Sequence, residues 1–337
     1  MKAFQLSATS GLDALKLADI AEPQPTRGQV LVRVRATSLN YRDLMVATGR
    51  YGGSMSLPLI PLSDGAGEIA AVGADVTQWK IGDRVTGTFF QRWLTGPVRR
   101  EAHNAALGGS MNGMLAEYVA LSAEGVIEMP AHLDFEEAAT LPCAALTAWN
   151  ALITAGKLSA DQTVLLLGTG GVSVFALQIA KMHGARVIIT SSSDAKLARA
   201  RTLGADATIN YRTTPDWEKE VFRLTGKTGV DHVIEVGGQD TFPKSLRALA
   251  LNGTISVIGG VSGFTSEMAF AEVLGKSAVI RGIYVGSREM FTAMNRAFAL
   301  HQLKPAIDRV FPLTDTPAAY RYGESGAHFG KVVIAIP

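Results

Sequence analysis

The sequence predicts an α/β protein built from two domains, an antiparallel, barrel-like domain followed by a doubly wound parallel sheet. Its 337 residues exceed the length that one ordinary core fills and indicate about two domains. Up to about Trp149, short runs of alternating polarity stand between turn signals, which is typical of antiparallel strands. After Gln162, apolar runs alternate with helical stretches, which is typical of a parallel sheet covered on both faces.

The first half contains four predicted strands. In "QVLVRVRATSLN", Val30, Val32 and Val34 fall on one face because side chains alternate along a strand. The strands are predicted at residues 29–40, 67–73, 82–90 and 114–121. The segment 91–112 is long and irregular, and such loops often form lids or binding loops.

The second half predicts strands and helices in alternation. The strands are predicted at residues 163–168, 185–190, 206–211, 232–238 and 254–260, with helices at 172–184 and 194–204. A further helix is predicted at 287–303, and the chain ends in a predicted strand at 330–336.

Composition excludes several classes of partner. The 32 basic residues nearly balance the 30 acidic ones, which argues against nucleic acid or an anionic membrane as a partner. No apolar run approaches the ~20 residues of a membrane span, and the N-terminus lacks the apolar region of a signal peptide. We therefore expect a cytoplasmic protein. Cys143 is the only cysteine, so an intramolecular disulfide is excluded.

The segment "VLLLGTGGVSVFALQIA" predicts a dinucleotide-binding loop between a strand and a helix. Its glycines allow a sharp turn and let backbone N–H groups approach a pyrophosphate at the helix N-terminus. Ser173 stands where a third glycine is usual and is small enough to replace it. A tight turn between two buried elements is the alternative. The predicted contacts are Gly168, Thr169, Gly170, Gly171 and Val172.

The end of the next strand favours NADPH over NADH. NAD-binding units place an acidic residue about 20 residues after the loop, where it binds the ribose hydroxyls. Here that strand ends in Ser191 and Ser192, which leave room for a 2′-phosphate and can donate hydrogen bonds to it. Lys196 supplies positive charge, although a solvated helix lysine is its alternative interpretation. Tyr211 and Arg212 follow the next strand and add to this predicted phosphate site.

Six motifs in order along the chain resemble the medium-chain dehydrogenase/reductase superfamily, in its zinc-independent, quinone-oxidoreductase-like branch. They are "NYRD", "GAGEIAAVG", "GDRV", "AEYV", "AATLPCAALTAW" and the glycine loop. The resemblance implies a GroES-like β-barrel catalytic domain at 1–147, a Rossmann NADPH-binding domain at 148–283 and a C-terminal return to the catalytic domain at 284–337. It also implies an active site between the domains and a homodimer that pairs an edge strand within 266–283.

The resemblance also bears on zinc. Zinc alcohol dehydrogenases of this superfamily bind catalytic zinc with a cysteine, a His-Glu pair and a second cysteine. The matching positions here are Asn40, Ser63-Asp64 and Cys143. One thiolate without imidazole or a second thiolate is no catalytic zinc site. The four-cysteine structural lobe is also missing, so we expect no metal and a packing role for Cys143.

Without a metal, the predicted reaction is hydride transfer from NADPH to a small electrophilic acceptor, a quinone or an α,β-unsaturated carbonyl. The resemblance places Asn40 and Asp43 near the nicotinamide and its ribose, and Tyr51 at the substrate mouth. Tyr41 and Arg42 are close in sequence, and a tyrosine or arginine binds a carbonyl oxygen well. Packing is the alternative role for both tyrosines. Family quinone reductases often have a second tyrosine where Met45 stands here.

Further cofactor contacts are expected from the same resemblance and from the carboxyl ends of the later strands. They are Thr147, Gly237, Gly259, Gly260, Val261, Ile283, Val285 and Lys331. Phe89, Phe90 and Trp93 are expected to line or cover the acceptor pocket.

Two other functions fit the same sequence. One is an alcohol dehydrogenase that acts without zinc. The other is a non-enzymatic dinucleotide-binding protein with a structural or regulatory role, against which the intact "NYRD" segment argues.

Overall fold

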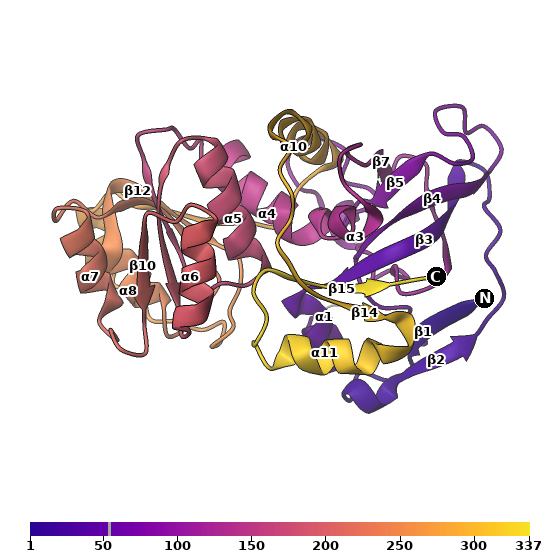
Figure 1. Ribbon diagram of the computed structural model, residues 1–337, viewed down its shortest axis with the longest axis horizontal. Helices are drawn as coiled ribbons and strands as arrows, with labels where there is room; N and C mark the ends of the chain where they lie inside the picture. Colours follow the sequence, from indigo (N-terminus) through magenta and orange to yellow (C-terminus); the bar gives the residue numbers. More distant parts are fainter. Residues whose placement is uncertain (53–54) are drawn as a thin grey trace. The chain divides into compact units, whose positions relative to one another are not determined.

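The computed structural model describes residues 1–52 and 55–337 and divides the chain into two compact units (Figure 1). The first unit contains Met1–Leu146 and Gly286–Pro337, and the second contains Thr147–Val285. The chain therefore leaves the first unit after Leu146 and returns to it at Gly286.

A seven-stranded sheet forms the main sheet of the first unit. Its order is β14-β15-β3-β4-β5-β7, with β6 also paired to β3, and β1 and β2 form a separate hairpin. Neighbouring strands are antiparallel except β14 and β15, which are parallel. The strands are β1 (Lys2–Leu6), β2 (Leu15–Asp19), β3 (Gln29–Leu39), β4 (Asp64–Val72), β5 (Arg84–Gly87), β6 (Tyr118–Ser122), β7 (Val126–Glu128), β14 (Ile307–Pro312) and β15 (Lys331–Ala335).

Strand β3 is the centre of this sheet because β4, β6 and β15 all pair with it. Val30, Val32 and Val34 are buried in the core of the unit, as their alternation predicts. The register places Ser38 opposite Asp64, so polar residues meet where β3 ends and β4 begins. This junction positions the candidate site.

Helix α1 (Tyr41–Ala47) begins directly after β3 and packs against α11 (Thr316–Glu324). Its first turn is closed by the backbone N–H of Asn40, which donates to Asp43 Oδ2 at 2.9 Å. An acidic residue at this position also interacts favourably with the helix dipole. The N-terminus of α1 therefore presents Asn40, Arg42 and Asp43 beside the end of β3.

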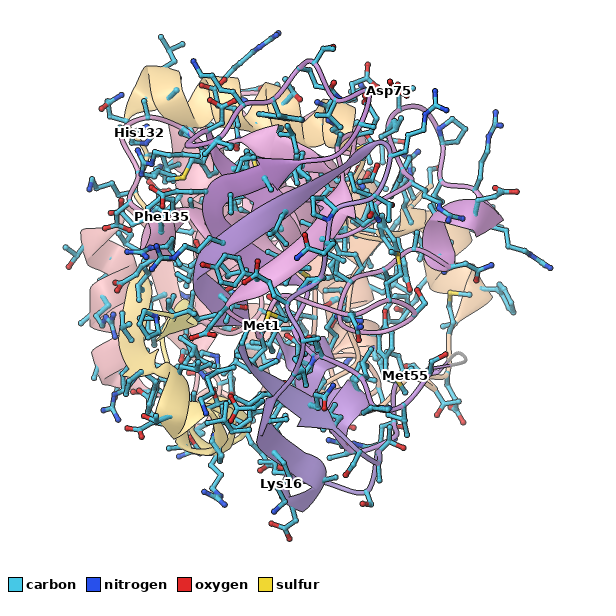
Figure 2. All side chains as sticks on the ribbon, turned by 90° about the vertical axis from the view of Figure 1, so that its right-hand side faces the viewer. Met1, Lys16, Met55, Asp75, His132 and Phe135 are labelled. Carbon is cyan, nitrogen blue, oxygen red and sulfur yellow. The ribbon has the colours of Figure 1, made fainter. Side chains whose placement is uncertain are left out.

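The remaining helices of the first unit are short except α10. They are α2 (Arg100–His103), α3 (Phe135–Ala138) and α10 (Arg288–His301), with 3₁₀ turns at Leu12–Ala14 and Leu313–Asp315 and a π-helical turn at Leu141–Ala145. Helix α4 (Leu146–Trp149) and a second π-helical turn (Asn150–Thr154) follow. Figure 2 shows the side chains of the first unit, with Lys16 and Asp75 at opposite margins of the view, where both are exposed to solvent.

The second unit is a six-stranded sheet in which every pair is parallel, in the order β10-β9-β8-β11-β12-β13. The order reverses beside β8, the point at which ligands bind in such sheets. Its strands are β8 (Thr163–Leu166), β9 (Arg186–Ser191), β10 (Ala207–Asn210), β11 (Val230–Glu235), β12 (Leu249–Val257) and β13 (Val279–Gly282). Its helices are α5 (Gly171–Met182), α6 (Asp194–Thr202), α7 (Trp217–Leu224), α8 (Phe242–Ala248) and α9 (Phe270–Gly275).

Every predicted strand and helix corresponds to an element of the structure, with shifts at the ends. The largest shifts are in β12, which begins at Leu249 although the strand is predicted from residue 254, and in β6, which begins at Tyr118 although the apolar run begins at Met114. Residues before Tyr118 are buried as an irregular segment whose backbone pairs with the segment 59–62. Among the helices that the structure describes, none is long and apolar enough to cross a membrane.

Candidate functional site

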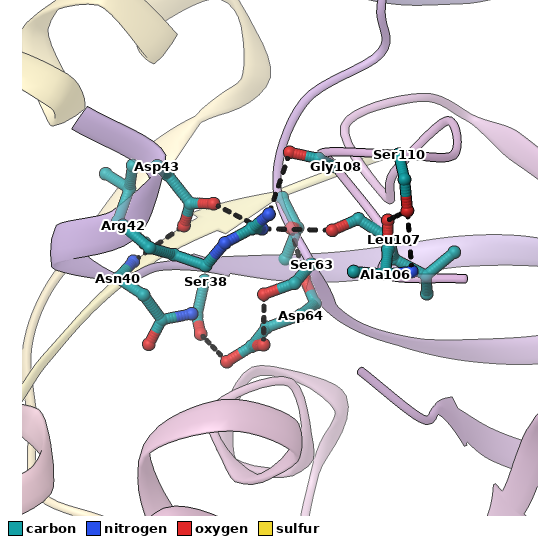
Figure 3. Close-up of polar contacts among 12 residues, drawn as sticks. Ser38, Asn40, Arg42, Asp43, Ser63, Asp64, Ala106, Leu107, Gly108 and Ser110 are labelled. Atoms are coloured by element: carbon teal, nitrogen blue, oxygen red, sulfur yellow. Dashed lines mark hydrogen bonds and ion pairs between the residues drawn. The ribbon is translucent and has the colours of Figure 1, made fainter. Parts of the chain in front are cut away.

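A cluster of buried polar side chains lies where β3, β4 and β15 meet. Asp64 is fully buried; the Ser63 hydroxyl donates to its Oδ1 at 2.8 Å, and Ser38 Oγ lies 3.3 Å from its Oδ2 (Figure 3). Lys331 Nζ lies 3.7 Å from the same Oδ2. A buried carboxylate needs such partners because water cannot solvate it.

Lys331 connects this cluster to the start of α1. Its ammonium donates to the carbonyl of Leu39 and to Asn40 Oδ1, each at 2.6 Å. Burial raises the pKa of Asp64, and Lys331 is the strongest opposing influence, followed by the Asn40 and Ser63 side chains. Lys331 was predicted as a cofactor contact. The structure gives its ammonium three partners within the protein, so it fixes the Asn40 side chain in place.

Arg42 and Asp43 form a second buried ion pair. Arg42 Nη1 lies 3.2 Å from Asp43 Oδ1, and both side chains are almost completely buried. Burial raises the pKa of Asp43 to about 6, although Arg42 acts in the opposite direction. Burial also acts to lower the pKa of Arg42, but the charge of Asp43 and the contacts with Tyr51 outweigh it and raise that pKa. The pair is therefore coupled, and charge on either member depends on the other.

The Arg42 guanidinium also contacts three segments that are distant in sequence. Its Nη1 donates to the carbonyl of Leu107 at 2.9 Å and its Nη2 to that of Gly108 at 3.2 Å (Figure 3). Its Cζ lies 4.9 Å from the ring centroid of Tyr51 and 4.9 Å from that of Phe89. Both distances lie within the range of cation–π contacts.

The structure therefore brings together most of the predicted catalytic residues. Asn40, Arg42, Asp43 and Tyr51 lie around the N-terminus of α1, whereas Tyr41 is 41% exposed on the same helix. Phe89 and Phe90 are buried and make an edge-to-face contact at 4.6 Å.

In the second unit, the glycine loop has the shape that a dinucleotide needs. Gly168 has a φ of 72°, a conformation that favours glycine. A Cβ at Gly168 or Gly170 would meet no atom within 4 Å, so open space lies above the loop. Helix α5 begins at Gly171, and no side chain caps it. Its first N–H groups are thus available to a pyrophosphate, and the residues fit a dinucleotide.

Ser173 has a definite structural role in this loop. Its buried hydroxyl donates to the carbonyl of Leu167, at the end of β8, at 2.7 Å. Helix α5 can therefore approach the strand closely with serine at this position, where glycine is usual. The serine also adds a hydrogen bond between the helix and the residue that follows β8.

The residues predicted to bind the 2′-phosphate lie at the ends of β9 and β10. Thr169 Oγ1 lies 3.3 Å from Ser191 Oγ, and the Gly168 N–H donates to Thr190 Oγ1 at 3.1 Å. The end of β9 is thereby attached to the glycine loop. Ser192 and Lys196 are half-buried, and Tyr211 and Arg212 are exposed.

Asp194 belongs to the first turn of α6, as the sequence indicates. Its Oδ1 accepts from Asn210 Nδ2 at 2.8 Å, and Ser193 is the N-cap of the helix. The strand end at Ser191–Ser192 therefore carries hydroxyls and no carboxylate of its own.

Two predicted cofactor loops, after β11 and β12, lie side by side. The N–H of Ser262 donates to the carbonyl of Gly237 at 2.8 Å, and that of Val261 donates to Val236 at 3.3 Å. Gly237 and Gly260 are crowded, because a Cβ at either position would lie within 3.0 Å of a neighbouring side chain or backbone atom. Ile283, Val285 and Thr147 are buried, and the Val285 carbonyl accepts from Asn150 Nδ2 at 2.9 Å.

Glu235 organises the first of these loops and was missed in the sequence. Its Oε1 atom accepts from the backbone N–H groups of Gly237 and Gly238 at 2.8 and 3.0 Å and from the Thr241 hydroxyl at 2.6 Å. Ser245 donates to Oε2. A signal was present, since a carboxylate that directly follows the apolar pair Val233–Ile234 in a buried parallel strand requires partners.

A Rossmann-type sheet with an open glycine loop in one unit and a buried polar cluster in the other are the features of a dinucleotide-binding protein. Two family models match the chain: the alcohol dehydrogenase GroES-like domain at residues 26–131 and the zinc-binding dehydrogenase at residues 171–299. The chain belongs to the medium-chain dehydrogenase/reductase superfamily. The predicted combination of a GroES-like and a Rossmann-type unit is confirmed.

Three curated relatives show the range of the family around this chain. A zinc-type alcohol dehydrogenase-like protein of Schizosaccharomyces pombe is 46% identical over 97% of this chain and 96% of its own length. A 2-methylene-furan-3-one reductase of Solanum lycopersicum is 32% identical over 99% of this chain and 79% of its own length. The quinone oxidoreductase of Homo sapiens is 29% identical over 100% of this chain and 98% of its own length.

Two solved structures share the fold. An NAD-dependent alcohol dehydrogenase is 36% identical with a TM-score of 0.92, and each chain is covered completely. A mycobacterial protein solved in complex with NADPH is 27% identical with a TM-score of 0.85, again over both complete chains. These neighbours use different nicotinamide cofactors, so the fold alone does not select one.

The residues at the family's zinc position do not fit zinc. Burial and the charge of Asp64 raise the pKa of the Cys143 thiol, which disfavours the thiolate that a metal requires. Asn40 and Ser63 are weak ligands, and the charge of Asp64 is matched by Lys331. Across residues 1–52 and 55–337, no group of three or more His, Cys, Asp or Glu side chains is arranged to hold a metal ion.

Proposed function

We propose that this protein is an NADPH-dependent oxidoreductase that transfers hydride to a quinone or an α,β-unsaturated carbonyl without zinc. One observation carries the proposal: the dinucleotide loop is open to a ligand, whereas the zinc position holds Asn40, Ser63, Asp64 and Cys143, whose thiol pKa is raised by burial. A site without a strong Lewis acid suits the reduction of an acceptor that is already polarised.

The choice of NADPH rests on the end of β9. Ser191 and Ser192 stand where NAD-binding units carry an acidic residue, and Lys196 follows in the first turn of α6. A neighbour solved with NADPH shows that this fold can hold that cofactor. Titration of the purified protein with both cofactors tests it, and equal or tighter binding of NADH would contradict it.

The acceptor class rests on the groups around α1 and on the relatives. Bound NADPH supplies the hydride. Negative charge then develops on the acceptor's oxygen, and a positioned donor must stabilise it or supply a proton. The Tyr51 hydroxyl is our candidate donor, and its ring, like that of Phe89, lies against the Arg42 guanidinium. The names of the quinone oxidoreductase and of the furanone reductase support acceptors of this kind.

A panel of acceptors tests the function. We expect NADPH oxidation with quinones, enones or enals, slower turnover of simple alcohols with NADP⁺, and less than stoichiometric zinc in the purified protein. Preferential turnover of alcohols would favour the zinc-lacking alcohol dehydrogenase. Tight NADPH binding without turnover of any acceptor would favour a non-enzymatic role, and stoichiometric zinc would overturn the metal-free mechanism.

We also propose a homodimer formed through the edge of the second unit. β13 ends the parallel sheet, and among the described residues no strand pairs with its outer side. Phe264, Phe270 and Leu274 near this edge are 72%, 77% and 82% exposed. An unpaired edge beside apolar side chains is suited to a second copy of the same edge. Sedimentation should show a dimer, and Leu274→Glu should shift it to a monomer.

A further inference from the structure

We infer that Arg42 is a positioning residue: its guanidinium, anchored on the Leu107–Gly109 segment, fixes the ring of Tyr51 and so sets the orientation of the proton donor. The inference rests on the proposed function for its turnover measurement. It assigns Arg42 an indirect role, whereas the sequence suggested direct binding of a carbonyl oxygen.

The first step of the argument is that both Nη groups of Arg42 are held within the protein, while its Nε is buried and has no hydrogen-bond partner among the described residues. Both Nη atoms bind backbone carbonyls, and Nη1 also contacts Asp43. Arg42 is only 8% exposed. An acceptor molecule would have to displace these partners in order to bind the guanidinium ends, which costs buried hydrogen bonds.

The second step is that Arg42 is anchored at one side and stacked at the other. The carbonyls of Leu107 and Gly108 hold the planar group at fixed distances, and the rings of Tyr51 and Phe89 lie against it at 4.9 Å each. A guanidinium is rigid and planar, so an anchor on its Nη atoms defines the plane against which an aromatic ring can stack. An ammonium has no such plane.

The third step is that the guanidinium packs directly on the backbone of Gly109. A Cβ at Gly109 would lie 2.6 Å from Arg42 Nη2, so glycine is required for the guanidinium to occupy its position. The backbone of Tyr51 is attached to α1 through its N–H, which donates to the carbonyl of Met45 at 3.1 Å. Backbone and ring of Tyr51 are therefore each tied to α1, the ring through Arg42.

Two variants perturb the stack in different ways. Arg42→Lys keeps a charge for Asp43 but removes the plane, and Gly109→Ala pushes against Nη2 while Arg42 itself stays. Arg50→Lys is the matched control, because Arg50 is an exposed arginine next to Tyr51 whose Nε contacts Thr48 at 3.0 Å. Thermal unfolding shows whether each variant folds. If one of the two does not fold, the measurements are made on the other.

The activity test is a double-mutant cycle with Tyr51→Phe. Loss of a proton donor should lower kcat about a hundredfold. Arg42→Lys and Gly109→Ala should each lower kcat by at least about tenfold with the NADPH dissociation constant within about twofold, and neither should lower kcat further in the Tyr51→Phe background. Effects that multiply in the double variants would overturn the inference.

A second measurement remains informative if the protein turns over no acceptor, an outcome that rejects the proposed function alone. The seven tyrosines are replaced by 3-fluorotyrosine, and the fluorine resonance of Tyr51 is identified by its loss in Tyr51→Phe. Arg42→Lys and Gly109→Ala should shift or broaden this resonance, and Arg50→Lys should leave it unchanged. An unchanged Tyr51 resonance in folded Arg42→Lys would overturn the inference.

Discussion

Lys331 and Asp64 form an ion pair, with Nζ and Oδ2 3.7 Å apart, in which both side chains are almost completely buried. Lys331 comes from the last strand of the chain and Asp64 from the fourth, yet both strands flank β3. The pair joins the returning C-terminal segment to the candidate site. Lys331 also donates to Asn40 Oδ1, so the last strand of the chain helps to orient a residue of the candidate site.

Replacing one member of this pair should be costly. Lys331→Met leaves Asp64 buried without its counter-ion and should lower the free energy of unfolding by about 3–5 kcal/mol. Chemical denaturation measures the change. Because the double variant Lys331→Met/Asp64→Asn removes both charges, it should recover much of the loss. Lys304→Met, which disrupts the exposed pair with Glu137, should cost no more than about 1 kcal/mol. Equal losses in the two lysine variants would contradict this account.

Asp43 should give the protein a pH-dependent stability component. Its pKa of about 6 in the folded state exceeds its ordinary value of 3.8 because of burial, so the folded protein holds this proton more tightly than the unfolded chain. Its contribution is therefore present below pH 4 and is lost as the pH rises through 6. The ionisable groups that act on Asp43 are Arg42 on α1, Asp64 on β4 and Lys331 on β15. Asp43 in turn acts on Tyr320 of α11.

Comparison with Asp43→Asn isolates this component, since the other titrating groups are shared. The free energy of unfolding of the unsubstituted protein, relative to Asp43→Asn, should fall by about 2–3 kcal/mol between pH 4 and pH 7. Denaturation at a series of pH values measures it. A difference that rises over this interval would mean that Arg42 dominates and that the pKa of Asp43 is lowered in the folded protein.

The sequence was sufficient for the second unit because its pattern is local. Apolar strands, glycine turns and helices follow one another directly between Thr163 and Gly260, and each signal lies within the element that it predicts. Ser173 shows the limit of this approach. Its spacing identified a missing glycine, but its hydrogen bond to Leu167 depends on how α5 packs on β8.

The sequence was less informative about the first unit because its site joins distant segments. "NYRD" indicated Asn40, Arg42 and Asp43, but no local pattern connects Arg42 with Leu107 and Gly108, 65 and 66 residues further along. The partners of Lys331 at Leu39 and Asn40 are likewise 292 and 291 residues away. Such contacts depend on which strands are neighbours in the sheet. The polarity pattern within a single strand does not indicate its neighbours.

Glu235 should affect cofactor binding without contacting the cofactor. Its Oε1 accepts from the N–H groups of Gly237 and Gly238 and its Oε2 accepts from Ser245, whereas a glutamine has one acceptor oxygen and cannot accept on both sides. Glu235→Gln should therefore loosen the loop after β11 and weaken NADPH binding about tenfold, or by about 1.4 kcal/mol. Fluorescence titration measures the dissociation constant. Glu220→Gln, at a surface pair with Arg223, should leave it within about twofold, and an unchanged constant in Glu235→Gln would refute the loop-anchoring role.

Ser192 and Lys196 should determine the choice between NADPH and NADH. Ser192 is half-buried at the end of β9, and a carboxylate there would lie where NAD-binding units carry their acidic residue. Ser192→Asp should repel a 2′-phosphate and accept hydrogen bonds from ribose hydroxyls, so the ratio of NADPH to NADH affinity should fall by at least about tenfold. Lys196→Met should lower the affinity for NADPH alone, because only that cofactor carries the extra phosphate. Isothermal titration with both cofactors measures the four constants. If Lys196→Met weakened NADH binding to the same extent, Lys196 would contact a part common to both cofactors and the phosphate site would have to lie elsewhere.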